Sequence, residues 1–495
     1  MNGSAQNRYR SVLRSSSLIG GAAFVNIAIG MIRTKFAAVL LDPSGVGLIN
    51  MYSAIIAPIV TTSNLGLNTS GIRAIAEASG RNETERVARV VKTLQKTVWF
   101  SGILGCLITM FFSYWLSFFT FQNADHTIYI SALGITVLFT NLTMGQSCVL
   151  QGTRRILDVA KINIWGAISG TFASIPCYFW WGGEGIVPSI IISSFFAFFT
   201  SWWFARKVEI ADVELSNALL FSEAKKMLNF GLPLMGTSLQ AALVAYFLRL
   251  IISSQFGLDG VGVWSAAFAI SGVLVNFVLN AMGTDYYPRL TAVAHDNALV
   301  SKEVNAQLEV ALLMATPALL ITILFAPIGV ELLYSGKFDA AIPVLRWSVY
   351  GILGRVISWP FSFIIIAQGR GKFFFVAELL AHIVHFFLIY ICSKFWGLPG
   401  TGIGFMILYI YYFIFMTVTA HFIARTHPTF SNLKLITFVL LLLIGVGFLP
   451  LNISNPIVYY VISGLISIIV TALALVRLFQ LTGVSINDLR ARLRY

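Results

Sequence analysis

The sequence predicts an all-α integral membrane protein with about 14 transmembrane helices, and two observations lead to this prediction. Of its 495 residues, 57% are hydrophobic and 11% are charged, whereas a soluble domain has about 25% charged residues. The apolar residues form runs long enough to cross a bilayer as a helix, which takes about 20 residues. These runs lack the alternating pattern of a β-barrel strand, so helices are the structure that satisfies the backbone within the membrane.

The apolar runs are bounded by charged residues, Gly and Pro, and each is expected to form one span. The first six spans are expected at 15–40, 46–68, 93–118, 128–150, 158–181 and 185–205. The second six are expected at 228–253, 261–285, 308–334, 343–367, 373–395 and 400–423. Two more are expected at 433–450 and 456–477.

The net charge of +13 would suggest nucleic acid in a soluble protein, but here its distribution has another explanation. If the N-terminus is cytoplasmic, the inside loops, the termini and the adjoining span ends hold 26 Lys and Arg. The outside loops and their adjoining span ends hold only Lys337 and Lys394. This is a strong positive-inside pattern. We therefore expect both termini in the cytoplasm of a bacterial cell, a multi-pass location in the inner membrane, and no nucleic-acid partner.

An internal repeat divides the spans into groups. The segment LDPSGVGLINMYSAI (41–55) has a counterpart GLDGVGVWSAAF (257–268) at an offset of 215. Arg33 matches Arg249 and Arg73 matches Arg289 at 216, and Gln151 matches Gln368 at 217. A six-span repeat gives two pseudo-symmetric lobes in one orientation, with a substrate path between them. We expect an N-lobe at 1–206, a cytoplasmic linker at 207–227, a C-lobe at 228–426, and two further helices with a basic tail at 427–495.

Several features argue against an enzyme or a metalloprotein. No outside loop exceeds about a dozen residues, which leaves little room for the catalytic residues of a membrane glycosyltransferase or polymerase. The four cysteines all lie in apolar runs without metal-ligand spacing. We expect a transporter without a cofactor or a metal site.

The stretch LDPSGVGLINMYSAIIAPIVTTSNLGLNTSGIRAIAEA (41–78) resembles the second-span region of Wzx-type O-antigen flippases. These belong to the multidrug/oligosaccharidyl-lipid/polysaccharide (MOP) exporter superfamily, and the last two spans resemble those of its lipid II flippases. The resemblance implies a V-shaped, MATE-like pair of lobes that opens alternately to each side. It also implies a substrate of undecaprenyl-pyrophosphate carrying an oligosaccharide. Drug exporters share the fold, so the fold alone does not identify the substrate.

Ionisable residues inside the spans are costly and therefore indicate function. Arg33, Arg249 and Arg355 lie within spans, and guanidinium groups suit a diphosphate. Lys35 is a secondary candidate, because it points about 200° away from Arg33 around the helix. The alternative is that Arg33 and Arg249 extend toward the interface or bind backbone carbonyls as anchors.

Five further residues are weaker candidates. Arg73 and Arg289 lie at the cytoplasmic ends of the second and eighth spans, where they either catch the diphosphate or only anchor the topology. Glu378, His382 and His385 share one helix face. They form either a proton- or sodium-coupling relay or a polar seam between helices.

These expectations combine into one functional prediction. The chain is expected to move an undecaprenyl-pyrophosphate-linked oligosaccharide, such as an O-antigen repeat unit, to the outer leaflet by alternating access. The alternatives are a lipid II-type flippase, a cation-coupled multidrug exporter and, less favoured, a glycosyltransferase. Membrane lipids and other polysaccharide assembly proteins are the expected partners, and one chain is sufficient for a substrate path.

Overall fold

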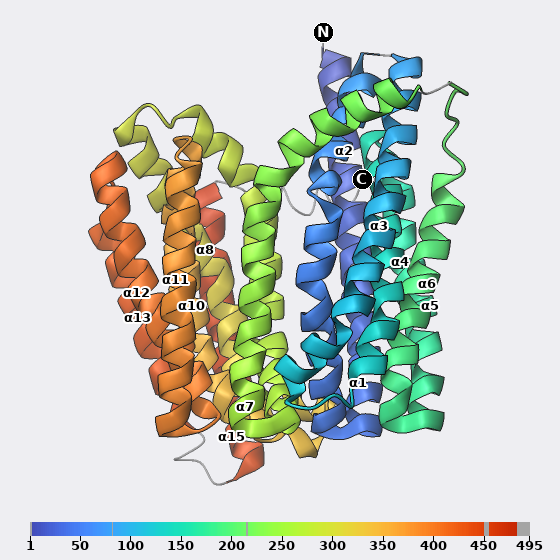
Figure 1. The fold of residues 1–495 in the computed structure, drawn as a ribbon. Helices are drawn as coiled ribbons and strands as arrows, with labels where there is room; N and C mark the ends of the chain where they lie inside the picture. The colour runs from blue at the N-terminus through green and yellow to red at the C-terminus, as the bar shows by residue number, and fades with distance from the viewer. Residues whose placement is uncertain (1, 82, 214–215, 450–454, 483–495) are drawn as a thin grey trace. The chain divides into compact units, whose positions relative to one another are not determined.

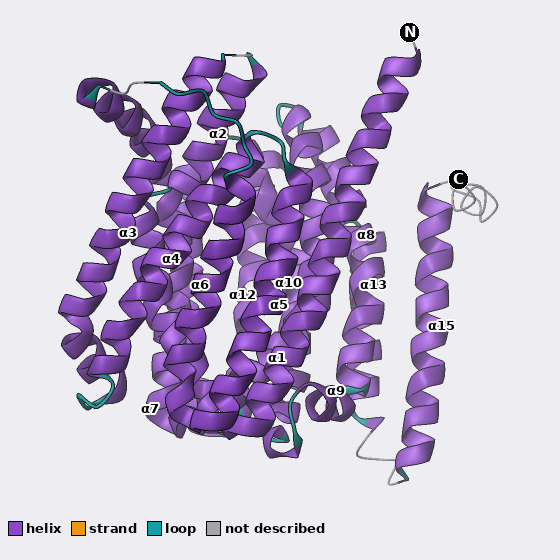
Figure 2. Cartoon of the chain, turned by 90° about the vertical axis from the view of Figure 1, so that its right-hand side faces the viewer, coloured by secondary structure: helices purple, strands orange, loops and turns teal. Residues whose placement is uncertain are grey.

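The structure, a computed structural model, describes residues 2–81, 83–213, 216–449 and 455–482. Throughout these ranges the chain forms helices and loops and no strand (Figure 2), as the sequence predicts. Eleven helical stretches are long and apolar enough to cross a membrane. Three of them contain 50, 56 and 57 residues, which is enough for two crossings each. The stretches are therefore long enough for the predicted number of spans.

The chain divides into two compact units, Met1–Gly262 and Val263–Tyr495, here called the first and second unit. The boundary lies inside a long helix, α7 (Asn217–Ala292), and not in the predicted linker at 207–227. The first half of α7 is grouped with the preceding helices because it packs against them, as described below. The lobe boundaries expected from the sequence stay a prediction.

The first unit is built from α1 to α6 and the first half of α7 (Figure 1). Its elements are α1 (Asn2–Asn64), α2 (Leu67–Gly80), α3 (Thr84–Phe121), α4 (Thr127–Gly152), α5 (Ile156–Trp181), the 3-10 turn η1 (Gly182–Gly185) and α6 (Ile186–Ala205).

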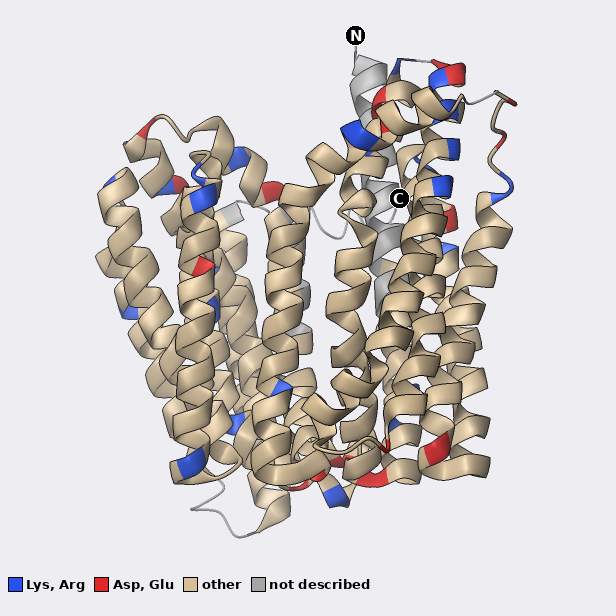
Figure 3. Ribbon diagram, viewed as in Figure 1, with Lys and Arg blue, Asp and Glu red and all other residues tan. Residues whose placement is uncertain are grey.

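The core of the first unit lies where α2, α3 and α4 meet. Leu67 and Ile75 of α2 pack with Leu94 of α3 and Val149 of α4, and all four are fully buried. Met227 joins this cluster from the beginning of α7, which is one reason that this half of α7 belongs to the first unit. Most Lys and Arg of the unit lie at the end of the helices where the chain begins (Figure 3), as the positive-inside pattern requires. Which end faces the cytoplasm stays a prediction.

The second unit contains the rest of α7 and the helices that follow it. Its elements are α8 (Asn297–Leu324), α9 (Ala326–Leu333), the turn η2 (Gly336–Phe338), α10 (Ala341–Ala367), α11 (Gly371–Trp396), α12 (Pro399–Ala424), α13 (Phe430–Gly447) and α15 (Pro456–Thr482). The most apolar windows of α8 and α10 are each 67% buried, against 28% or less in α11, α12, α13 and α15. The core therefore lies along α8 and α10, and the other helices expose apolar side chains, which is the arrangement expected in lipid.

Local sequence signals explain where two of these helices begin. The carboxylate of Asp296 accepts hydrogen bonds from the backbone N–H groups of Ala298 (2.8 Å) and Leu299 (3.2 Å) at the start of α8. The hydroxyl of Thr429 accepts a bond from the N–H of Asn432 (3.3 Å) at the start of α13. Asp and Thr are favoured N-cap residues because they satisfy these otherwise unpaired donors.

The helices α1 and α7 are each interrupted once. The break in α1 is at Asp42 (φ 59°, ψ −178°), and the break in α7 is at Gly257 (φ 68°, ψ −171°). Figure 1 shows that α1 runs away from the N-terminus and returns to α2 at the same end, so the break joins two spans. The expected gap between the first two spans, 40–46, contains Asp42.

Just after these breaks, α1 and α7 cross with their backbones in contact. A Cβ atom on Gly47 would lie 1.9 Å from the carbonyl oxygen of Leu258, and one on Gly262 would lie 2.0 Å from that of Pro43. The contact is reciprocal, because 215 residues separate both Pro43 from Leu258 and Gly47 from Gly262. Only glycine permits this approach.

Candidate functional site

The backbone provides an independent measure of the internal repeat. Residues with positive φ occur in pairs 215 positions apart: Asp42 and Gly257, Arg154 and Gly369, and Gly182 and Gly397. Such residues mark turns that few side chains tolerate, so three pairs at one spacing indicate two copies of the same chain path. The repeat expected from the sequence is thus visible in the backbone, with a register of 215 at these turns.

This register corrects the expected equivalence of Arg33 and Arg249. Counted from the breaks, Arg33 lies nine residues before Asp42, and Arg249 lies eight residues before Gly257. The equivalent of Arg33 is therefore Leu248, and Arg249 corresponds to Thr34. The offset of 216 was wrong because it aligned identical residues, whereas the break sets the register of the preceding helix. A shift of one residue along a helix rotates the side-chain direction by about 100°, so the two cations are not at equivalent positions of the repeat.

Arg249 makes contact with its own helix. Its Nη1 donates a hydrogen bond to the carbonyl oxygen of Ala245 (3.0 Å), one turn earlier. The side chain is half-buried, as are those of Arg33 and Lys35 on α1. The bond to Ala245 matches the anchoring alternative for Arg249.

In the second unit, Arg355 and Glu378 both lie within electrostatic range of one tyrosine. Arg355 is on α10, Glu378 is on α11, and the charges of both act on Tyr409 of α12. Tyr412, one turn further along α12, donates a short hydrogen bond to Oε1 of Glu378. The structure thus brings together two residues for which the sequence predicted separate roles.

The two histidines of α11 have different surroundings. His382 lies within electrostatic range of Glu378. His385 is buried against Phe405, with ring centroids 5.8 Å apart, and its Nε2 has no hydrogen-bond partner within the described residues. Glu378 is thus hydrogen-bonded to Tyr412 and lies within electrostatic range of Tyr409 and His382, whereas His385 has an apolar neighbour in Phe405.

Sequence reasoning missed Tyr409 and Tyr412. They lie in a 26-residue apolar helix and carry no charge, so only packing identifies their role. Their spacing of three residues along one helix face was the available signal.

Arg73 lies in a small cleft among α2, α3 and the beginning of α7. Its guanidinium lies 4.2 Å from the ring centroid of Phe230, a cation–π contact. The cleft has a volume of about 250 Å³ and is also lined by charged side chains of both signs: Glu77, Arg86, Glu223 and Lys226.

Arg289, by contrast, is surrounded by acceptors. It forms ion pairs with Asp285 (2.9 Å) and Glu303 (3.1 Å), and it donates a hydrogen bond to Gln307 (3.2 Å). These partners neutralise its charge. The environment of Arg289 therefore matches a structural anchor better than an anion site, whereas Arg73 keeps an open cleft beside it.

Two loop residues outside the spans show perturbed ionisation. The hydrogen bond from Lys92, 2.5 Å long, lowers the pKa of the exposed Asp212 carboxyl. Burial lowers the pKa of His126, against a smaller opposing effect of Asp125. His126 Nδ1 lies 2.8 Å from the Tyr52 hydroxyl, and its ring stacks on Phe121 at 3.9 Å. This contact ties the loop before α4 to α1.

The described residues contain no group of three or more His, Cys, Asp and Glu side chains that could hold a metal ion. The candidate residues supply guanidinium, carboxylate, phenol and imidazole groups within the helices. Together they can bind an anion and can hold or transfer a proton.

A family model described as "Polysaccharide biosynthesis protein" matches residues 37–343 of the chain. The chain is also 22% identical over 417 residues to the lipid III flippase of Escherichia coli (strain K12), an alignment that covers 81% of this chain and 96% of that protein. The lipid III flippase of Shigella flexneri gives the same values.

Two solved structures share the fold. The lipid II flippase MurJ in an inward closed conformation has a TM-score of 0.69 at 16% identity, covering 94% of this chain and 99% of that one. An inward-facing MATE multidrug transporter of the MOP superfamily has a TM-score of 0.62 at 16% identity, covering 81% and 96%. The chain therefore has a MurJ- and MATE-like helical transporter fold, and the expected fold class is confirmed.

Proposed function

The chain belongs to the polysaccharide biosynthesis protein family, and from this membership we propose that it is a flippase for a lipid-linked oligosaccharide precursor. The observation that carries the proposal is the presence of arginines within the apolar helices of a transporter fold. A diphosphate-linked lipid brings negative charge into the bilayer, where an unmatched charge is costly. Transport by alternating access needs no covalent chemistry, so the protein would act as a transporter and not as an enzyme.

We assign the diphosphate of an undecaprenyl-pyrophosphate carrier to Arg33 and Arg249, with Lys35 as a secondary ligand. Because the two arginines are not symmetry mates, they would approach the diphosphate from different directions around their helices. Arg73, with its open cleft, would make the first contact on the cytoplasmic side. Arg289 would act mainly as an anchor. We propose, from the positive-inside pattern, that both termini lie in the cytoplasm and that the chain lies in the inner membrane.

We further propose that Glu378 couples transport to a proton or a sodium ion, together with His382 and His385. The support is the hydrogen bond from Tyr412 to Glu378 and the electrostatic interaction of Tyr409 with both Glu378 and Arg355. An ion bound at Glu378 would weaken its attraction to Arg355. Arg355 would then be released toward the diphosphate, which links the two binding events.

The substrate class contains several candidates. The similarity to lipid III flippases supports a lipid-linked surface polysaccharide precursor, and an O-antigen repeat unit is our specific proposal. A lipid II-type precursor has the same carrier chemistry and is supported by the shared fold. A cation-coupled multidrug exporter is the candidate from another class, and other polysaccharide assembly proteins are the proposed partners.

The decisive experiment measures the appearance of a labelled undecaprenyl-pyrophosphate oligosaccharide in the outer leaflet of vesicles containing the purified protein. Arg33→Ala and Arg249→Ala should each reduce transport about 10- to 100-fold, the effect of losing one hydrogen bond to a charged group. Lys302→Ala, which removes an exposed charge on α8, is the matched control. Normal transport by both alanine variants would exclude this diphosphate site. Transport of drugs without any transport of glycan lipid would favour the exporter.

A second experiment tests coupling by imposing a pH or sodium gradient across the same vesicles. Glu378→Gln should remove the dependence of transport on the gradient, and Tyr412→Phe should weaken it. Glu331→Gln, an exposed carboxylate on α9, is the control. A gradient dependence that persists in Glu378→Gln would contradict the coupling role. It would not affect the diphosphate assignment, which the transport of the alanine variants tests.

A further inference from the structure

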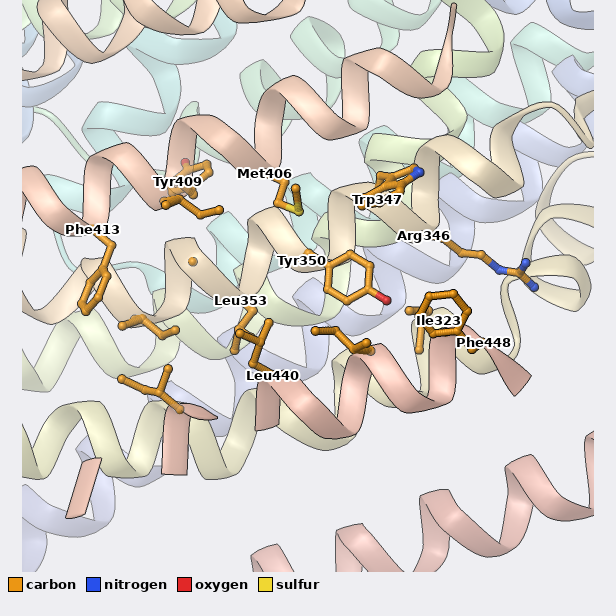
Figure 4. Close-up of a pocket in the computed structure, with 16 residues that line it drawn as sticks. Ile323, Arg346, Trp347, Tyr350, Leu353, Met406, Tyr409, Phe413, Leu440 and Phe448 are labelled. Atoms are coloured by element: carbon orange, nitrogen blue, oxygen red, sulfur yellow. The ribbon is translucent and has the colours of Figure 1, made fainter. Parts of the chain in front are cut away.

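An apolar groove of about 590 Å³ runs along the second unit between α10 and α12 on one side and α13 on the other, with Ile323 of α8 at its base. Its volume is within the range of ligand sites, about 300–1,000 Å³. Figure 4 shows Leu353, Met406, Tyr409 and Phe413 on the walls formed by α10 and α12, and Leu440 on α13 facing them. Ile410 and Phe448 are 52% and 57% exposed, so the groove is open on a side that meets the bilayer.

Among the residues that the structure describes, the one charged side chain that lines this groove is Arg346, and it lies at one end (Figure 4). Arg346 is five residues after the start of α10, about 8 Å along the helix. On the charge pattern this is the outer end, at the depth where lipid head groups meet the hydrocarbon core.

The guanidinium of Arg346 is only partly used within the described part of the chain. It contacts the hydroxyl of Tyr459 and acts electrostatically on Tyr350. Its Nε is buried without a hydrogen-bond partner. A half-buried cation beside neutral hydroxyl groups therefore has donors available for an anion.

We propose that this groove binds a resident anionic phospholipid, with an acyl chain along the groove and its phosphate on Arg346. Contact between water and the apolar walls is unfavourable, whereas an acyl chain removes the walls from water. The single cation complements the single negative charge of a phosphodiester. It does not complement the larger charge of the transported diphosphate. The inference is independent of the proposed transport function.

The bound lipid has a structural consequence. α13 packs on α8, but it meets α12 across the groove. An acyl chain there fills the space between α12 and α13 and fixes the first of the two helices that follow the twelve-span repeat. Because the lipid binds only the folded state, it should raise the unfolding temperature.

The test uses the full-length protein, purified and delipidated in detergent, with thermal unfolding and native mass spectrometry as readouts. Phosphatidylglycerol is the probe, and diacylglycerol with the same chains is the comparison without phosphate. Arg346→Gln removes the charge, and Lys394→Gln, at the outer end of α11, is its matched control. Leu440→Trp fills the groove, and Leu441→Trp changes the adjacent residue, which is 62% exposed and does not line the groove.

Phosphatidylglycerol should raise the unfolding temperature of the wild type more than diacylglycerol does. Its apparent affinity should fall about tenfold or more in Arg346→Gln, the effect of one charge-assisted hydrogen bond. It should change less than about twofold in Lys394→Gln. Leu440→Trp should lose the bound lipid that Leu441→Trp retains. If Leu440→Trp does not fold, the Arg346→Gln comparison decides.

Two outcomes would overturn the proposal. Equal stabilisation by diacylglycerol, or an unchanged affinity in Arg346→Gln, would show that no phosphate is bound at Arg346. Displacement of phosphatidylglycerol by an equal concentration of undecaprenyl pyrophosphate would assign the groove to the transported lipid.

Discussion

The breaks in α1 and α7 have nearly the same backbone shape but different residues. Asp42 and Gly257 differ by less than 10° in both φ and ψ, and the glycine crossing that follows each break is reciprocal. The cations that precede the breaks differ by one position. The repeat therefore preserves the places where backbones meet and allows the side chains inside the helices to differ. In this chain the fold is symmetric and the candidate anion site is not.

The largest expected effect concerns the crossing itself. Gly47→Ala or Gly262→Ala should destabilise the protein by about 3 kcal/mol or more, because each new Cβ overlaps a backbone carbonyl. Gly30→Ala is the matched control: the same helix has open space there, and alanine is worth about 1 kcal/mol over glycine in a helix. The measurement is the free energy of unfolding of all three variants in detergent.

The double variant with both alanines sharpens this comparison. If the contact is reciprocal, one shift of the backbones relieves both overlaps, so the double variant should be less destabilised than the sum of the single ones. Additive effects would mean that the two contacts are independent.

The second prediction exchanges the residues at the breaks. Gly257→Asp should cost about 1 to 3 kcal/mol, because this positive-φ region is almost restricted to glycine. Asp42→Gly should increase stability by a smaller amount, since glycine has no steric penalty there but loses more conformational entropy. Asp42 has interactions of its own. A loss of stability in Asp42→Gly would show that these outweigh the backbone strain.

The third prediction restores the symmetry of the cations. The double variant Leu248→Arg, Arg249→Leu moves the charge to the position equivalent to Arg33. Transport of the labelled glycan lipid should fall about tenfold, which corresponds to about 1.4 kcal/mol, because the guanidinium is turned by about 100°. Unchanged transport would show that only the presence of the charge matters.

The smallest effect concerns a contact that only the first repeat contains. The spacing of 215 from Tyr52 and His126 leads to Ala267 and Ala341, which cannot form such a hydrogen bond. Burial lowers the pKa of His126 in the folded protein, so its neutral ring contributes its full stabilisation above about pH 6.5, the pKa of a free histidine. This stabilisation is lost as the pH falls from there through the lowered pKa.

The unfolding temperature of the wild type should therefore fall between pH 7.5 and pH 5, and that of His126→Gln should fall less. The difference should correspond to about 1 kcal/mol or less. His295→Gln, at an exposed histidine in the loop before α8, is the control. An equal pH dependence in wild type and His126→Gln would contradict the role of this contact.

The sequence predicted the helices well, because an apolar run of spanning length has few alternatives in lipid. The expected gaps between spans contain the turns at Asp42, Gly182 and Gly257. The register of the cations was wrong by one residue, because identical residue types were aligned and the backbone break was not visible. The interaction of both Arg355 and Glu378 with Tyr409 could not be predicted, since it depends on the packing of a third helix.

The 76-residue helix α7 also determines how the chain can be divided. A cut in the non-helical segment 209–213 leaves α7 whole, and two fragments expressed separately would each keep their long helices. A cut at Gly262, where the two units meet, would sever α7 at the crossing and leave Pro43 facing a new chain end. Split versions of this protein should therefore reassemble from the first pair of fragments and not from the second.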